Sequence, residues 1–465
     1  MRAVVFLFSL SAATPVFAAE PPAASPACID QQPAAVATYQ TLWSEFADPG
    51  LICLAQHVLN DNPNLKAIRA RVEAGSSIIK AQRARRQLSV DGLITGYSGN
   101  DQIGSNTDAS LGRAGLEARW EIDVRQRLSL EEARAGYARD RDAALYESSA
   151  FSLLADLTQR LIALRALDGK IDLQIQIVNL RLRQVQRETA RLQSGLVRGG
   201  RSQDLEANLA AEQNALEGLQ AQRQATLVQI EALTGYSRDQ LNDALRPKAL
   251  PPVPAPAAVA ALPLDRLAFN PKVRAAASEV AREETNHQIA LAARWPRVSL
   301  SGFLGLQDGS NGLRLSANPI QSLSAQLLSP IFDRGRIDAD VATAASYKKS
   351  AIASYHAALT EALEDSQLAV AEYEGAYKQG LASEKALAMS VRALQIDQSR
   401  QRAGLVSDDI VTEGELKRLS RQMAIIQEQE QAHVAFVRLQ RVLGPQSALS
   451  TSSAYNYAKV QGLKQ

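Results

Sequence analysis

Apolar residues change their spacing along the chain in a fixed order. They recur at helical spacing up to about Gln87 and then alternate with polar residues over 88–97 and 114–123. This alternation predicts two strands, and the Gly-, Asn- and Ser-rich stretch between them predicts the loop of a hairpin. From Val124 to Gln193 the helical spacing returns without a proline. The stretch predicts one helix of roughly 100 Å, at 1.5 Å per residue.

The second half of the chain repeats this order. Asn62-Pro63 recurs as Asn270-Pro271, 208 residues later. Alternation predicts strands at 297–306 and 320–332, and helical spacing predicts a second long helix at 337–402. Shorter return helices are predicted at 202–233 and 408–442. We therefore expect two copies of one unit that lie side by side in one fold.

The repeats are expected at 62–245 and 264–445, with a Pro- and Ala-rich linker at 246–263. Residues 1–18 have the charged start, short apolar run and small residues of a secretory signal peptide. A periplasmic segment at 19–61 and a tail at 446–465 flank the repeats. We find no other stretch of about 18 apolar residues, so a transmembrane helix is not expected. The exported chain is then either soluble or a β-barrel.

Charge and residue chemistry exclude several functions. The net charge is +2, from 51 basic and 49 acidic residues, which gives no basic patch for nucleic acid. The four histidines are scattered, no Gly-rich phosphate loop is present, and nothing assembles a nucleophile with a base. We expect no cofactor, no metal and no enzymatic activity. Cys28 and Cys53 are the only cysteines, and in an exported chain they could form a disulfide. A lipid on Cys28 is the alternative, although Ser25-Pro26-Ala27 lacks the Leu of that signal.

Two hairpins in one chain do not make a stable sheet protein. A two-stranded hairpin is marginal alone in water, and small closed barrels need about eight strands. Three chains would supply twelve strands, an even number suited to an outer-membrane barrel, and a ring of long helices that cover one another. The predicted fold class is therefore an α+β membrane protein whose trimeric barrel continues into a helical barrel.

The ordered motifs resemble the TolC-like outer-membrane efflux protein family over about residues 40–445. The resemblance rests on Asn62-Pro63, on Trp120-Glu121-Ile122-Asp123 and, in the second repeat, on residues 294–302. The most specific motif is the strand-to-helix turn Pro330-Ile331-Phe332-Asp333-Arg334-Gly335-Arg336. The first repeat departs from it after Asp123, because Arg125-Gln126-Arg127 replaces the usual Gly-Arg.

The resemblance implies the outer-membrane channel of a resistance–nodulation–division efflux pump. It implies a homotrimer in outer-membrane lipid that passes drugs or other small molecules outward, together with a periplasmic adaptor protein and an inner-membrane transporter. A type I protein-secretion channel is the alternative within transport, and the Pro-Ile-Phe-Asp turn favours small-molecule efflux over it. A periplasmic coiled-coil scaffold is the alternative of another class, and the two alternating hairpins count against it.

The resemblance also places the channel's aperture at the tips of the helical hairpins. The aperture candidates are Asp204, Asp408, Asp409 and Glu413, since a trimer turns each acid into a ring that favours cations. Acids near a helix start also simply favour the helix dipole. Val406 stands where the name-giving protein of the family has a gating arginine, so a gate here would be held differently.

The adaptor-contact candidates are the tip residues Gly195, Leu196, Gly404 and Leu405. A plain helix C-cap explains the glycines equally well, because glycine is preferred there.

Aromatic residues near the strands have two interpretations. They could form the aromatic belt at the membrane interface, or they could pack at the junction of strands and helices. The residues concerned are Tyr97, Trp120, Trp295, Phe303 and Phe332.

Overall fold

The computed structural model describes residues 49–100, 108–196, 200–245, 250, 253, 269–308 and 318–443. The predicted signal peptide, Cys28, most of the linker and the tail lie outside these residues. The first repeat contains α2 (Pro49–Asp61), α3 (Pro63–Ala84), β1 (Ser89–Asn100), β2 (Asp108–Ile122), α4 (Arg127–Gln193), α5 (Gly200–Thr234) and α6 (Arg238–Ala244). The second repeat contains α7 (Pro271–Ala292), β3 (Arg297–Asp308), β4 (Asn318–Leu328), α8 (Arg336–Arg402) and α9 (Asp408–Leu443).

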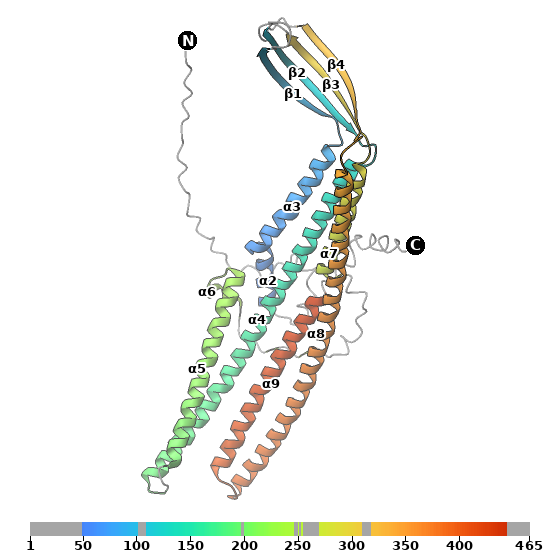
Figure 1. Ribbon diagram of the computed structural model, residues 1–465. Helices are drawn as coiled ribbons and strands as arrows, with labels where there is room; N and C mark the ends of the chain where they lie inside the picture. The colour runs from blue at the N-terminus through green and yellow to red at the C-terminus, as the bar shows by residue number, and fades with distance from the viewer. Residues whose placement is uncertain are drawn as a thin grey trace, which may run out of the picture.

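The molecule is a long rod of helices with a sheet at one end (Figure 1). Helices α4 and α8 run from the sheet to the far end, where each turns back into a shorter helix. Helix α3 lies along the sheet-side part of α4, and α5 lies along its far part; α7 and α9 flank α8 in the same way. The two turns at the far end, α4–α5 and α8–α9, are called the hairpin tips below.

The repeated Asn-Pro begins both of the shorter sheet-side helices. The Asn62 side-chain oxygen accepts hydrogen bonds from the backbone N–H of Asn64 (3.0 Å) and Leu65 (3.3 Å). Asn270 caps α7 through the N–H of Lys272 (2.9 Å). In both helices proline follows directly, where its missing N–H costs nothing. The repeat thus encodes two matched helix starts.

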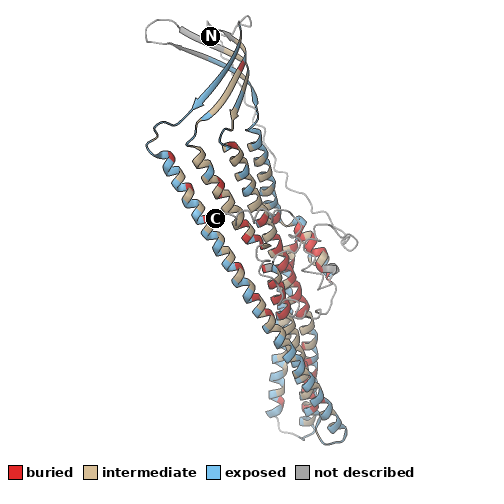
Figure 2. Ribbon diagram, turned by 90° about the vertical axis from the view of Figure 1, so that its right-hand side faces the viewer, coloured by how far each residue is buried: buried red, intermediate tan, exposed pale blue. Residues whose placement is uncertain are grey.

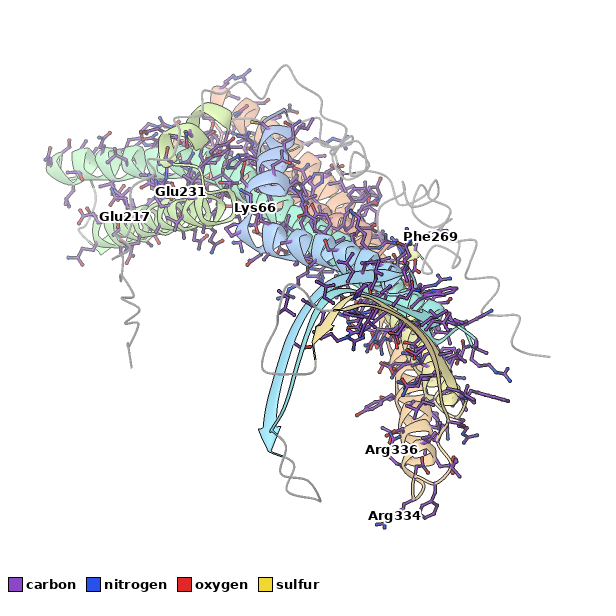
Figure 3. The ribbon with its side chains drawn as sticks, turned by 90° about the horizontal axis from the view of Figure 1, so that it is seen from above. Lys66, Glu217, Glu231, Phe269, Arg334 and Arg336 are labelled. Atoms are coloured by element: carbon purple, nitrogen blue, oxygen red, sulfur yellow. The ribbon has the colours of Figure 1, made fainter. Side chains whose placement is uncertain are left out.

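All four strands form one antiparallel sheet in the order β1-β2-β3-β4. The central pairing joins the two repeats, with Gly112 opposite Asp308 and Ile122 opposite Val298. The strands curve along their length (Figure 3). One face carries apolar side chains that are more than half exposed: Val90, Ile94, Leu116, Leu304, Leu323 and Leu327. The other face carries mainly polar residues, among them Arg113, Glu117, Arg119, Ser301 and Ser324.

Strand β4 ends at Leu328, four residues before the predicted end at 332. The prediction was wrong there because Ser329-Pro330 interrupts the ladder, since proline has no N–H to donate. The other strands are longer at their loop ends than predicted: β1 reaches Asn100 and β2 begins at Asp108. The glycine and serine residues in these stretches, taken alone, indicate a loop. Pairing with a neighbouring strand nevertheless extends the strands through them.

An aspartate at each strand-to-helix turn caps the following long helix. Asp123 accepts hydrogen bonds from the N–H of Leu128 and Ser129, both 2.9 Å, and from the Ser129 hydroxyl at 2.7 Å. Asp333 accepts from Gly335 (3.1 Å) and Ile337 (2.8 Å). The backbone N–H groups of Ile337 and Gly335 hold the pKa of Asp333 below its ordinary value.

The residue before each long helix has a left-handed backbone. Gly335 has φ +83°, which glycine adopts without strain, and Arg336 then begins α8. Gln126 fills the corresponding place before α4 at φ 57°. The first repeat therefore keeps the turn without the glycine. Beside the second turn, Phe332 is largely exposed.

The apolar core lies midway along the rod (Figure 2). Helices of both repeats meet there, among them α2, α4, α5, α8 and α9. Its members include Leu54, Leu154, Ile230, Tyr373 and Phe436, all 2% exposed or less. Cys53 is buried in α2 near this core. Helix α6 was not predicted. Its start is fixed by a capping box between Ser237 and Gln240. Within the described residues, no helix is both long and apolar enough to cross a membrane.

Candidate functional site

The hairpin tips share one backbone geometry. Gly195 (φ 70°) ends α4 and Gly404 (φ 72°) ends α8. The N–H of Leu196 donates to the carbonyl of Arg191 (3.0 Å), and that of Leu405 donates to Arg400 (2.9 Å). This is the Schellman pattern, in which a left-handed glycine closes the helix. The glycines are thus explained as C-caps.

The leucines after these glycines are not explained by the cap. In a Schellman turn an apolar side chain at this position frequently packs back on the helix. Here Leu196 is 75% exposed and Leu405 is 74% exposed. Each hairpin tip therefore presents a leucine to its surroundings.

The buried side chains of helix α4 become polar as the helix approaches the hairpin tips. Its buried positions recur three or four residues apart, at Gln174, Ile177, Leu180, Gln184 and Glu188. Ile177 and Leu180 are apolar, whereas the two members nearest the tip, Gln184 and Glu188, have polar side-chain ends. The contacts of α4 therefore become more polar toward the hairpin tips.

Arginines of α4 pair with the acids at the start of α9. Arg187 pairs with Asp408 and donates to the Thr412 hydroxyl at 2.9 Å. Arg181 lies 3.5 Å from a Glu413 carboxylate oxygen. Because α4 and α9 belong to different repeats, these contacts tie one hairpin to the other.

At the hairpin tips, Asp409 pairs with two arginines. Its Oδ2 atom lies 2.7 Å from Arg201 at the start of α5 and 3.3 Å from Arg191 of α4. Burial alone opposes ionisation, but the two arginines outweigh it and hold the pKa of Asp409 below its ordinary value. Glu188, almost fully buried, lies 3.6 Å from Arg191 and 3.9 Å from Arg201. Two acids from different hairpins thus share the same two arginines.

The structure brings three of the four aperture candidates together and leaves one apart. Asp408, Asp409 and Glu413 lie in the first two turns of α9, and each pairs with an arginine of α4. Asp204 is exposed on α5, and no ion pair of it occurs within the part of the chain described.

Sequence reasoning missed the arginines that the acids meet. A signal was present: Arg183, Arg187 and Arg191 recur four residues apart in α4, as basic side chains on one helix face do. Their pairing with a segment more than 200 residues away required the fold. Among the described residues, no three or more His, Cys, Asp or Glu are grouped to hold a metal ion.

Two features at the other end of the rod concern the predicted aromatics. Trp120 donates from its indole N–H to the carbonyl of Arg86 (3.1 Å), and Arg125 stacks on Trp295 with its guanidinium carbon 3.6 Å from the ring centre. Both contacts lie where strands meet helices, as the packing interpretation expects. Phe303 does not fit a membrane belt, because it lies on the polar face of the sheet and is 5% exposed.

Comparison with known proteins agrees with this architecture. The family described as outer membrane efflux protein matches residues 54–236 and 262–445, one match for each repeat. The chain is 27% identical over 424 residues to the pyoverdine export outer membrane protein OpmQ of Pseudomonas aeruginosa, covering 88% of this chain and 86% of that protein. It is 25% identical over 416 residues to the solvent efflux pump outer membrane protein SrpC of Pseudomonas putida, covering 86% of each.

Solved structures share the fold. The outer-membrane channel OprN superposes with a TM-score of 0.77 at 25% identity, covering 87% of this chain and 92% of that one. VceC of Vibrio cholerae superposes with a TM-score of 0.75 at 20% identity, covering 87% and 98%. The predicted TolC-like fold, the outer-membrane location and the role in efflux are confirmed by these comparisons. The chain belongs to the outer membrane efflux protein family.

Proposed function

We propose that three copies of this chain form the exit duct of a tripartite efflux system. The sheets join into a barrel in the outer membrane, and the helices form a tube through the periplasm that meets an adaptor and an inner-membrane pump. The observation that carries this proposal is the pair of matching repeats, each with a sheet hairpin and a long helical hairpin, in a chain of the efflux family.

The surface of the sheet supports closure with other copies. Strands β1 and β4 are the edges of the described sheet, and a free edge offers a row of backbone groups to a neighbouring strand. Three four-stranded sheets would give a twelve-stranded barrel. The exposed apolar face suits lipid, and the polar face suits a water-filled lumen.

The helical rod supports the same assembly. Helix α8 exposes large apolar side chains along much of its length, including Tyr347, Leu368, Met389 and Ile396. Neighbouring copies would cover them.

The paired tips form the closed aperture in this proposal. Opening the duct separates the hairpins, so the contacts of Arg187 and Asp409 must break. Each ion pair is partly exposed and contributes only about 0.2–1 kcal/mol. Several together hold the tip, yet no one of them makes opening prohibitive.

The substrates are proposed only as a class. One relative is named for pyoverdine export and another for solvent efflux, both small molecules. This favours small-molecule efflux over protein secretion for this chain.

Electron microscopy of the protein purified from outer membranes tests the assembly. We expect three-fold particles with a short barrel and a tube of roughly 100 Å, from long helices that rise 1.5 Å per residue. A monomer, or a rod recovered from the soluble periplasm, would contradict the duct.

Asp409→Asn tests the closed tip. The variant loses the charge that pairs with Arg191 and Arg201, so we expect a higher single-channel conductance in planar bilayers at neutral pH. The depressed pKa also sets the acid response of the unmodified protein. Its pairing is fully present above about 3.9, the ordinary pKa of Asp, and is lost as the pH falls through the lower folded value.

The unmodified channel should therefore open on acidification below about pH 4, and this step should be smaller in Asp409→Asn, which keeps only the other acid pairs of the tip. Glu374→Gln is the control, because it removes an exposed pair with Lys378 within α8. Equal conductance in all three proteins at every pH would refute the role of Asp409.

Asp204→Asn combined with Glu413→Gln tests the acid rings. Both acids are exposed in one copy, and three copies would place six of them around the aperture. We expect the preference for cations, measured from reversal potentials, to fall. An unchanged selectivity would remove both residues from the aperture.

Leu196→Ser combined with Leu405→Ser tests the adaptor contact. These leucines are exposed without a role in the cap, so we expect the trimer to remain intact while co-purification of the adaptor is lost. Val228→Ser, an exposed position on α5, is the control. Undiminished recovery of the adaptor would show that the tips contact something else.

A further inference from the structure

The polar face of the sheet contains one built feature that the duct's assembly does not use. It consists of Arg113 on β2, Phe303 on β3 and the two glycines between them, Gly115 and Gly305. Gly115 and Gly305 are directly opposite each other in neighbouring strands. If the proposed duct is correct, this face lines the lumen of the barrel.

The end of the Phe303 ring lies over the two glycines. A Cβ atom on Gly115 would meet the end of the ring at 2.8 Å, and one on Gly305 would meet it at 2.6 Å, both too close for real atoms. The ring therefore occupies the space that two side chains would take, and it is 5% exposed. Burying an aromatic ring on the polar face of a strand requires such a gap.

Arg113 covers the ring from the lumen side. Its guanidinium carbon lies 3.7 Å from the centre of the Phe303 ring, the distance of a stacked cation–aromatic contact. The stack holds the guanidinium parallel to the wall. One face of the group rests on Phe303, and we infer that the other face and the terminal Nη groups can meet a ligand.

Arg113 differs from the charged residues near it on the same face because its charge is not paired within the part of the chain that the structure covers. Arg119 is paired with Glu117 at 2.7 Å, and Glu121 with Arg127 at 2.5 Å. No ion pair of Arg113 occurs among the residues that the structure describes, and its Nε atom is buried without a hydrogen-bond partner. Arg113 also lies toward the loop end of the sheet, opposite Thr95 and Gln307 and away from the helices.

We propose that Arg113, held flat on Phe303, is a binding site for aromatic organic anions in the outer part of the lumen. Three copies would present three such groups at one level. A planar anion can stack on the free guanidinium face while its sulfonate or carboxylate accepts from the terminal Nη–H groups. The site would retain such molecules near the outer mouth, far from the acids at the tips.

The test is block of single channels in planar bilayers by pyrene tetrasulfonate added on the extracellular side. We expect brief, concentration-dependent block, and an apparent dissociation constant about fivefold higher in Arg113→Gln. Phe303→Leu should weaken the block as well. The guanidinium loses the aromatic ring on which it stacks, while leucine still fills the space above Gly115 and Gly305. Arg119→Gln is the matched control, since it lies on the same strand and face but is paired.

The outcomes separate the two proposals. Channels that conduct but are not blocked, or are blocked equally in the unmodified protein, Arg113→Gln and Phe303→Leu, would overturn the anion site and leave the duct intact. A protein that forms no channel under any condition would overturn the duct, and the anion site with it. Block that weakens equally in Arg119→Gln would also overturn the site, because general lumen charge would then explain it.

Discussion

Backbone hydrogen bonding at the sheet edges is the constraint on which this architecture depends. Each chain contributes a four-stranded sheet whose outer strands, β1 and β4, have no further strand beside them in the described chain. In a membrane such groups need a protein partner, because the bilayer core offers no water to bond with. The exposed apolar face, with side chains such as Ile94 and Leu323, is stabilised by contact with lipid instead of water. The repeat joins two hairpins into one sheet within a chain, and other copies must supply the partners of β1 and β4.

The two ends of each long helix are fixed by different means. At the sheet, Asp123 and Asp333 accept the first N–H groups of α4 and α8, so the change from strand to helix occurs at one defined residue. At the hairpin tips, left-handed glycines end the same helices. Both devices are local and repeat in the two halves. Sequence pattern could therefore locate the long helices to within a few residues.

What the sequence could not reveal depended on contacts between distant segments. Periodicity placed all four strands, but it misjudged the end of β4 because a proline outweighed the alternation of Leu327 and its neighbours. The acids of α9 were visible in the sequence, whereas their pairing with Arg187 and Arg191 depends on how the hairpins pack. Phe303 suggested a membrane-facing ring, and only the register with Gly115 places it on the polar face.

The distribution of apolar burial along α4 connects stability with opening. Around Leu154 and Leu157 the helix belongs to the apolar core that several other helices share, and burial of such side chains contributes about 1.5–3 kcal/mol each. At Gln184 and Glu188 the same seam is polar, and partly exposed ion pairs replace apolar contacts. Proteins open locally in the regions that have few buried apolar contacts. We expect a rod built in this way to separate first at its tips, while its centre keeps the helices in register. An exit duct with an aperture at its tips requires this order of events.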